Sequence, residues 1–445
     1  MVTNQQPTLP IPAAGAALND IIAKDCPTVL GVLSQLGKRF YFPAKGILSQ
    51  GAEAKAKAKR YNATIGIATD EKGPMHLACV HESFAAGMNP RELYEYAPSS
   101  GKPELRQAWQ QKQRQETPSL GDHPISLPVV TNALTHGLSL VGDLFLDAGD
   151  EVLVTDQMWE NYPLCWETRL GARVSTFPLF DTKLTGFNQN AFMQALAERK
   201  GRKLVVVLNF PNNPTGYSPT RAEAGAIVEA LKAAAAVGTR LVVVCDDAYY
   251  GMFFADDCER ESLFGRLAKA HENILAVKVD GATKEEFVWG LRVGFLTYGV
   301  KNGTAAAYAA LEQKTAGLVR ATISNVSHAS QTIVLKALLH PDFRAQQAEK
   351  VEILRQRAAA TGRESRKSEY ADCWDVYPFN AGYFMCLRVK GIEADALRLR
   401  LLDEHGLGTI ALGKTDLRVA FSCLLESQIP DVFARIAQAT RALRG

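Results

Sequence analysis

Side chains that can do chemistry follow a series of short apolar runs in the middle of the sequence. They are Thr135, Trp159, Asn213, Asp246, Tyr249, Lys284 and Arg292. An amine can act as a nucleophile, a carboxylate can hold a cationic nitrogen, and a guanidinium can bind an anion. Taken singly, each residue is more often structural, with Lys284 as a surface lysine, Asp246 as a helix cap and Trp159 as core.

One of these positions has the features of a phosphate site. The pair Val129-Val130 is followed by Thr131 to Thr135 and then by a helical stretch. The amides at the start of that helix and the Thr135 hydroxyl can hold a phosphate. Together with the aromatic plate, amide, carboxylate, phenol, lysine and arginine, this feature predicts a pocket for a planar, phosphorylated, nitrogen-bearing aldehyde.

The apolar runs that carry these residues predict strands of a buried parallel sheet. The runs are Val152 to Val154, Leu204 to Leu208, Leu241 to Cys245, Leu275 to Val279 and Gly294 to Tyr298. A run such as Val205 to Val207 is apolar on both faces, as expected where helices cover both sides of a sheet. Residues 221–238 predict such a helix, which begins after Thr220 and ends at Gly238. Ligands collect at the carboxyl ends of parallel strands, so the side chains above should meet at one edge.

The predicted fold class is α/β, with a mostly parallel wound sheet flanked by helices and a smaller α+β domain. Residues 1–18, rich in Pro and Ala, predict an N-terminal arm without regular structure. Residues 76–325 form the expected large domain. Residues 19–75 and 326–445, from both ends of the chain, form the expected small domain, with short strands around Tyr383 to Val389 and Leu417 to Phe421.

Four motifs in sequence order carry a resemblance to a known family. Gly281-Ala282-Thr283-Lys284 is followed by Gly290-Leu291-Arg292-Val293-Gly294, and Asn213-Pro214-Thr215-Gly216 precedes Asp246-Asp247-Ala248-Tyr249. Tyr96-Ala97-Pro98, with Gly101 and Arg106, is similar to a block near the start of the family's fold. From about residue 60 to 425, the chain resembles the fold-type I pyridoxal-phosphate aminotransferases of class I/II, in particular the aspartate and aromatic branch.

The resemblance implies that the cofactor is pyridoxal 5'-phosphate and assigns a role to each residue around its ring. Lys284 would hold the cofactor as a Schiff base and later move the substrate's Cα proton. Asp246 would pair with the pyridine nitrogen. Tyr249 and Asn213 would hydrogen-bond the phenolic oxygen, and Trp159 would stack on the ring.

The resemblance also implies how the phosphate is held. Arg292, Thr135 and the amides of Ala133 and Leu134 would bind it. Tyr96 would reach the phosphate of a neighbouring subunit, which implies a homodimer with shared active sites. The chain departs from the family pattern at Gly281, where many relatives have a serine, at Phe287, which is bulkier than usual, and at Ala133, which replaces a serine or glycine.

Two arginines are the candidate substrate ligands, because a guanidinium matches a carboxylate in two parallel hydrogen bonds. Arg418 resembles the family's α-carboxylate arginine, and Gly66 resembles the glycine that lets the substrate approach; Trp159 and Asn213 would line the same site. Arg320 resembles an arginine that binds the distal carboxylate from the partner subunit. A structural role for Arg320 is the alternative.

The expected reaction moves an amino group between an L-amino acid of the aspartate or aromatic type and a 2-oxo acid, with 2-oxoglutarate as the expected acceptor. The alternative is a C–S β-lyase or a related enzyme of the same fold, which would keep every residue named. A regulator built on the fold is a third reading. It would need a DNA-binding domain, for which the N-terminal extension is too short and insufficiently basic.

Composition excludes other function classes. The 445 residues include 22% charged residues with a formal net charge of +3 and no basic stripe, which disfavours nucleic acid as a partner. Eight cysteines without a CxxC pair are typical of a reduced protein. We find neither an apolar run of about 18 residues nor a signal peptide, so we expect no membrane association and a cytoplasmic location. We also expect no metal site.

Overall fold

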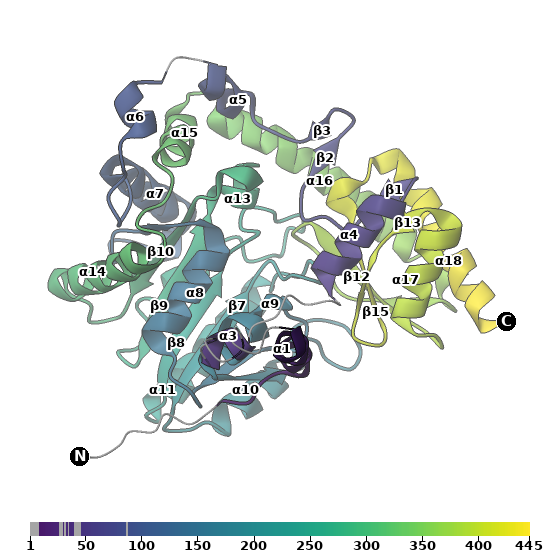
Figure 1. Ribbon diagram of the computed structural model, residues 1–445, viewed down its shortest axis with the longest axis horizontal. Helices are drawn as coiled ribbons and strands as arrows, with labels where there is room; N and C mark the ends of the chain where they lie inside the picture. The colour runs from purple at the N-terminus through teal and green to yellow at the C-terminus, as the bar shows by residue number, and fades with distance from the viewer. Residues whose placement is uncertain (1–8, 26–29, 31–32, 34, 40–45, 86–87) are drawn as a thin grey trace.

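A seven-stranded sheet with the order β4-β10-β9-β8-β7-β5-β6 forms the core of the large domain in the computed structural model (Figure 1). The model describes residues 9–25, 30, 33, 35–39, 46–85 and 88–445. The strands are β4 (Val129–Thr131), β5 (Glu151–Thr155), β6 (Arg173–Phe177), β7 (Lys203–Asn209), β8 (Arg240–Asp246), β9 (Ile274–Gly281) and β10 (Gly294–Gly299). Only β10 runs antiparallel to its neighbours in this sheet, which confirms the predicted mostly parallel arrangement.

The central strands are apolar on both faces because each face packs on helices. In β7, Leu204, Val206 and Leu208 belong to one core, whereas Val205 and Val207 belong to another. The helices α10 (Gln189–Ala197), α11 (Arg221–Ala236) and α12 (Phe264–Leu267) cover the first face. The helices α8 (Ala133–Phe145) and α14 (Ala305–Thr322) cover the second. This alternation explains the unbroken valine runs of the sequence.

Helix α11 begins and ends where its sequence signals predict. The Thr220 side chain accepts from the Glu223 amide, and the Glu223 carboxylate accepts from the Thr220 amide, which forms a capping box. The chain then leaves the helix at Gly238, whose φ of 93° suits glycine. The helix therefore closes the crossover between β7 and β8 and aligns their carboxyl ends.

The small domain is built on a four-stranded antiparallel sheet of order β11-β12-β15-β14. Its strands are β11 (Trp374–Val376), β12 (Phe384–Val389), β14 (Ile410–Leu412) and β15 (Asp416–Ala420). It is covered by α16 (Phe343–Ser365), α17 (Ala394–His405) and α18 (Ile429–Arg444). An early segment joins it, because β1 (Tyr61–Asn62) pairs with β13 (Leu407–Gly408) and α4 (Ile47–Lys57) packs beside them.

A third core lies next to β10, at the side of the large sheet that also carries β4. It holds α5 (Ala78–Ala85), α7 (Pro103–Glu116) and α15 (His328–Leu339), with α6 (Pro90–Tyr94) packed on α15. The short strands β2 (Thr69–Asp70) and β3 (Gly73–Pro74) form a hairpin that leads into it. Helix α16 extends from this core toward the small domain (Figure 1).

The N-terminal segment differs from the expected irregular arm. Helix α1 (Ala13–Asp25) includes residues 13–18, so the expectation is wrong there, while residues 1–8 lie outside the described residues. The side-chain amide of Asn19 in α1 donates to the Lys38 carbonyl of α3 (Gln35–Arg39). The Arg39 side chain donates to the Glu167 carbonyl of the large domain. Arg39 thus contacts the large domain, whereas the sequence placed residues 19–75 in the small one. Each helix in the described ranges is too short or too polar to cross a lipid bilayer.

Candidate active site

A cavity of about 450 Å³ lies between the carboxyl ends of the large-sheet strands and the small domain. Its wall includes seven of the residues that the sequence singled out. They are Gly66, Trp159, Asn213, Tyr249, Lys284, Arg292 and Arg418. These residues are far apart in the chain and come from both domains, so the fold brings together an amine, a phenol, an amide and two guanidinium groups.

Lys284 lies on the short helix α13 (Ala282–Glu285), directly after β9. Its Nζ is 4.7 Å from the centroid of the Tyr249 ring. Burial lowers the pKa of Lys284 to about 8, against the opposing charge of Asp246, and the nearby Arg292 lowers it further. The Tyr383 hydroxyl donates to the Lys284 carbonyl at 3.1 Å and fixes the backbone. A buried amine with this pKa is partly neutral near pH 7, as a nucleophile requires.

Asp246, the last residue of β8, lies behind the cavity wall and is 3% exposed. Burial raises its pKa to about 6, although the Tyr162 hydrogen bond and the charge of Lys284 act in the opposite direction. The Tyr162 hydroxyl donates to Asp246 Oδ2 at 2.5 Å, and the Ala248 amide donates to Oδ1 at 3.2 Å. With this pKa, Asp246 is ionised at neutral pH and can hold a cationic nitrogen.

Tyr162 was missed by the sequence analysis. It lies on α9 (Asn161–Pro163), and its ring stacks on Trp166 with centroids 5.1 Å apart and planes 4° from parallel. The sequence spacing could have identified Tyr162, because it stands one helical turn after Trp159, which follows the end of β5. The stack fixes the phenol, so the carboxylate of Asp246 has a rigid donor.

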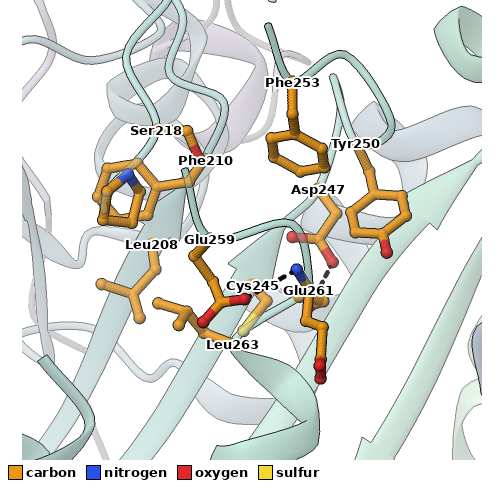
Figure 2. Close-up of a pocket in the computed structure, with 12 residues that line it drawn as sticks. Leu208, Phe210, Ser218, Cys245, Asp247, Tyr250, Phe253, Glu259, Glu261 and Leu263 are labelled. Atoms are coloured by element: carbon orange, nitrogen blue, oxygen red, sulfur yellow. Dashed lines mark hydrogen bonds between the residues drawn. The ribbon is translucent and has the colours of Figure 1, made fainter. Parts of the chain in front are cut away.

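The neighbouring acid, Asp247, belongs to a different cluster. Its Oδ2 accepts from the Ser262 hydroxyl at 2.6 Å and pairs with the Lys278 ammonium. Figure 2 shows Asp247 beside Tyr250 in a small space whose wall also includes Leu208 and Glu259. The two acids therefore have separate hydrogen-bond partners: Asp246 accepts from Tyr162 behind the cavity, and Asp247 accepts from Ser262.

Arg418 on β15 is fixed beside Asn213 and is 2% exposed. Its Nη1 donates to Asn213 Oδ1 and its Nη2 donates to the Thr64 carbonyl, both at 3.0 Å, while its Nε has no partner among the described residues. Asn213 is held in turn by a tight turn in which Gly216 has a φ of 72°, and a Cβ there would lie 1.9 Å from the Phe384 carbonyl oxygen. A guanidinium keeps its charge when buried, so it needs an anionic ligand.

The expected phosphate ligands lie around the start of β10. Arg292 precedes this strand at the cavity rim with a φ of 54°. Ala133, with a φ of 62°, begins α8 so close that a Cβ on Gly294 would be 2.7 Å from its carbonyl carbon. Ala133, Leu134 and Thr135 are not part of the cavity wall, and Thr135 is exposed. The start of α8 and Arg292 still form a positive region suited to an anion.

Tyr96 and Arg320 are not brought to this cavity. Tyr96 is 89% exposed, and Arg320, near the end of α14, donates to the Ser324 hydroxyl at 2.5 Å. The Ser99 hydroxyl donates to the Ser324 carbonyl at 2.8 Å, so the two segments are adjacent. Both side chains thus belong to one exposed surface away from the cavity of their own chain.

The cavity wall contains further polar groups that the sequence analysis missed. Thr283 Oγ1 and Trp289 Nε1 are buried and have no hydrogen-bond partner in the described ranges, and Lys55 of α4 adds a cation. Buried unpartnered donors are unfavourable unless a ligand satisfies them. These groups, with the amine of Lys284 and the carboxylate of Asp246, fit a planar phosphorylated pyridine aldehyde. The described residues contain no group of three His, Cys, Asp or Glu side chains that could hold a metal ion.

Comparisons with known proteins show similarity to one family of enzymes. The family described as aminotransferase class I and II matches residues 65–436. The chain is 26% identical over 288 residues to an aromatic-amino-acid aminotransferase of Escherichia coli, which covers 64% of this chain and 68% of that protein. It is 23% identical over 308 residues to a mitochondrial aspartate aminotransferase of Schizosaccharomyces pombe, covering 68% of each. A crystal structure of an aminotransferase from Anaerococcus prevotii has the same fold, with a TM-score of 0.81 at 22% identity over 92% of this chain and 99% of that one.

Proposed function

Because the chain belongs to the aminotransferase class I and II family, we propose that it moves the amino group of an L-amino acid of the aspartate or aromatic type to a 2-oxo acid, with 2-oxoglutarate as the expected acceptor. Members of this family are transferases that depend on pyridoxal 5'-phosphate. The observation that carries the proposal is that the Lys284 amine and the Arg418 guanidinium, from different domains, face one cavity. Amino-group transfer needs an amine that binds the cofactor and a guanidinium that binds the α-carboxylate of the substrate.

Each polar residue of the site has a distinct task in this proposal. The bound cofactor supplies an electron sink for the electrons that remain on Cα when a proton leaves. Lys284 removes that proton and returns it, and a pKa of about 8 suits both directions near neutral pH. Arg418 binds the α-carboxylate with Asn213 beside it, so Cα is held toward Lys284. Asp246 holds the pyridine nitrogen in its cationic form.

The side-chain class follows from the rest of the wall. Trp159, Trp289 and Phe384 line the cavity and offer aromatic surface to a substrate side chain. Of the residues that the structure describes, those in this wall include cations and no carboxylate, which favours a substrate with an acidic side chain. Both features together support the aspartate or aromatic type over small neutral amino acids.

We further propose a homodimer in which each subunit contributes to the other's active site. Tyr96 and Arg320 lie on one exposed surface, and Tyr94 nearby is 82% exposed. Large exposed aromatic side chains are characteristic of interaction surfaces. Light scattering at micromolar concentration should give the mass of a dimer, and a monomer would contradict the proposal.

The test of the reaction is a half-reaction with the purified, cofactor-loaded protein. Addition of L-glutamate, L-aspartate or L-phenylalanine should change the absorbance of the bound cofactor and release one equivalent of the matching 2-oxo acid. Lys284→Ala should abolish the change, while Lys301→Ala, at an exposed lysine, should not. Release of pyruvate and ammonia from cysteine conjugates without amino-group transfer would instead identify a C–S β-lyase.

A further inference from the structure

We propose that Lys55 binds the distal anionic group of the substrate within the same subunit and thereby selects amino acids and 2-oxo acids with a second acidic group. This inference rests on the proposed amino-group transfer and specifies its substrate class. Lys55 lines the same cavity as Lys284 and Arg418 although it lies on α4, a helix of the small domain.

The spacing of α4 explains why Lys55 faces the cavity. Ile47, Gly51 and Lys55 are four residues apart and all line the cavity wall. Residues at this spacing lie on one face of a helix. Gly51 carries no side chain, which leaves room on this face of the helix for a ligand beside Lys55.

The other faces of α4 hold the helix in place. The Gln50 side chain donates to the Ala411 carbonyl at 3.0 Å and accepts from the Ala411 amide at 2.7 Å. Ala54 is buried, and a Cβ on Gly408 would come within 2.7 Å of it. Glu53 pairs with Arg398 at 2.7 Å. These contacts fix the orientation of the helix and therefore the direction in which Lys55 points.

The charges of the cavity wall leave Lys55 without an internal partner. Among the described residues, the wall carries four cations, Lys55, Lys284, Arg292 and Arg418, and no carboxylate. The last three are matched to the cofactor aldehyde, its phosphate and the substrate α-carboxylate. Within the described part of the chain Lys55 forms no ion pair, whereas Lys57 on the next face pairs with Glu53. Glu160, the acid at the N-terminal end of α4, accepts from the Ile47 amide instead.

A lysine at this place suits ligands of more than one length. Its ammonium is a point charge on a flexible stem, whereas an arginine fork requires a fixed carboxylate orientation. The proposed subsite therefore takes side-chain carboxylates of both the aspartate and the glutamate length. Lys55 is exposed when no ligand is bound, and a hydrogen-bonded ion pair that forms between its ammonium and a ligand carboxylate is expected to change kcat/KM by about tenfold.

The test compares Lys55→Met with Lys57→Met as a matched control on the same helix. We expect the ratio of kcat/KM for aspartate to that for phenylalanine to fall about tenfold in Lys55→Met and to stay unchanged in Lys57→Met. The dissociation constant of succinate, a dicarboxylate without an amino group, should rise by a similar factor in Lys55→Met when calorimetry measures it on the cofactor-loaded protein. Added salt should weaken succinate binding to the wild type more than to Lys55→Met.

The outcomes separate this inference from the proposed reaction. Equal losses for aspartate and phenylalanine in Lys55→Met, with unchanged succinate binding, would overturn the role of Lys55 while leaving amino-group transfer intact. A wild type that transfers amino groups only from neutral amino acids would do the same. If no amino acid changes the cofactor absorbance, the proposed reaction fails, and the succinate measurement still decides whether Lys55 binds a dicarboxylate.

Discussion

We expect Asp246→Asn to make the cofactor-free protein more stable while it removes cofactor-dependent activity. Asp246 is 3% exposed, and burial raises its pKa from the ordinary 3.8 to about 6. A carboxyl group whose folded pKa lies above its unfolded pKa stabilises the protein only while it is protonated. That contribution is complete below pH 3.8 and is lost as the pH rises toward 6. An asparagine at this position has no such loss.

The magnitude follows from the two pKa values. The difference between the two pKa values, about 2, corresponds to about 3 kcal/mol at a pH above both values. At pH 5 the linkage gives about half of that free energy. The variant should therefore exceed the wild type in unfolding free energy by an amount that doubles between pH 5 and pH 8.

Urea unfolding of the cofactor-free proteins, followed by circular dichroism, measures this difference. Asp122→Asn, at an exposed carboxylate, is the matched control and should give the same small difference at both pH values. A stability gain for Asp246→Asn that is absent, or that does not change with pH, would refute the reasoning. In parallel, the variant should bind pyridoxal phosphate more weakly, because a neutral amide does not compensate a cationic pyridine nitrogen.

Three further variants test the active site and the residues that hold it in place. Tyr162→Phe removes a hydrogen-bond donor to the charged Asp246, an interaction worth about 1.5–3 kcal/mol. The pH below which cofactor affinity falls should therefore rise by about one to two units, as measured by fluorescence titration at a series of pH values, and an unchanged pH profile would contradict this. Lys112→Met leaves the carboxyl groups of Glu116 and Glu285, each 2.7 Å from the ammonium, without that cation and should lower the unfolding free energy by about 3 kcal/mol, part of which Lys112→Met/Glu285→Gln should restore. Arg320→Ala should lower kcat/KM for dicarboxylic substrates more than for aromatic ones, and equal losses would make Arg320 structural.

The sequence predicts best those strands of the large sheet that are buried on both faces. The runs at Leu204 to Leu208 and Leu241 to Cys245 became β7 and β8 because both faces of each strand are covered, and this pattern is visible in the residue types alone. The edge strand β6 was missed, since its residues are partly exposed and lack that pattern. The reversed direction of β10 was also invisible, because periodicity along one strand carries no information on the direction of its neighbour.

The candidate site was predictable to the extent that its residues stand at strand ends. Asn213 and Lys284 follow apolar runs directly, and parallel strands bring their ends to one edge. Arg418 needed the family resemblance, because nothing local to β15 shows that its side chain crosses to the large domain. Lys55 and Tyr162 were missed because their roles depend on helices whose packing is set by distant contacts, such as the bonds between Gln50 and Ala411.

The two residues after Lys284 are buried acids that hold in place the segment carrying the reactive amine. Glu285 is buried and its carboxylate pairs with Lys112 at 2.7 Å, while Glu286 is 1% exposed and its pKa is raised to about 7, chiefly by burial. Both acids point away from the cavity wall, since neither is part of it. Adjacent residues of a helix lie about 100° apart around its axis, so an anchored Glu285 leaves Lys284 directed to a different side of α13. The contact between Glu285 and Lys112 therefore helps to fix the short helix that carries the Lys284 amine.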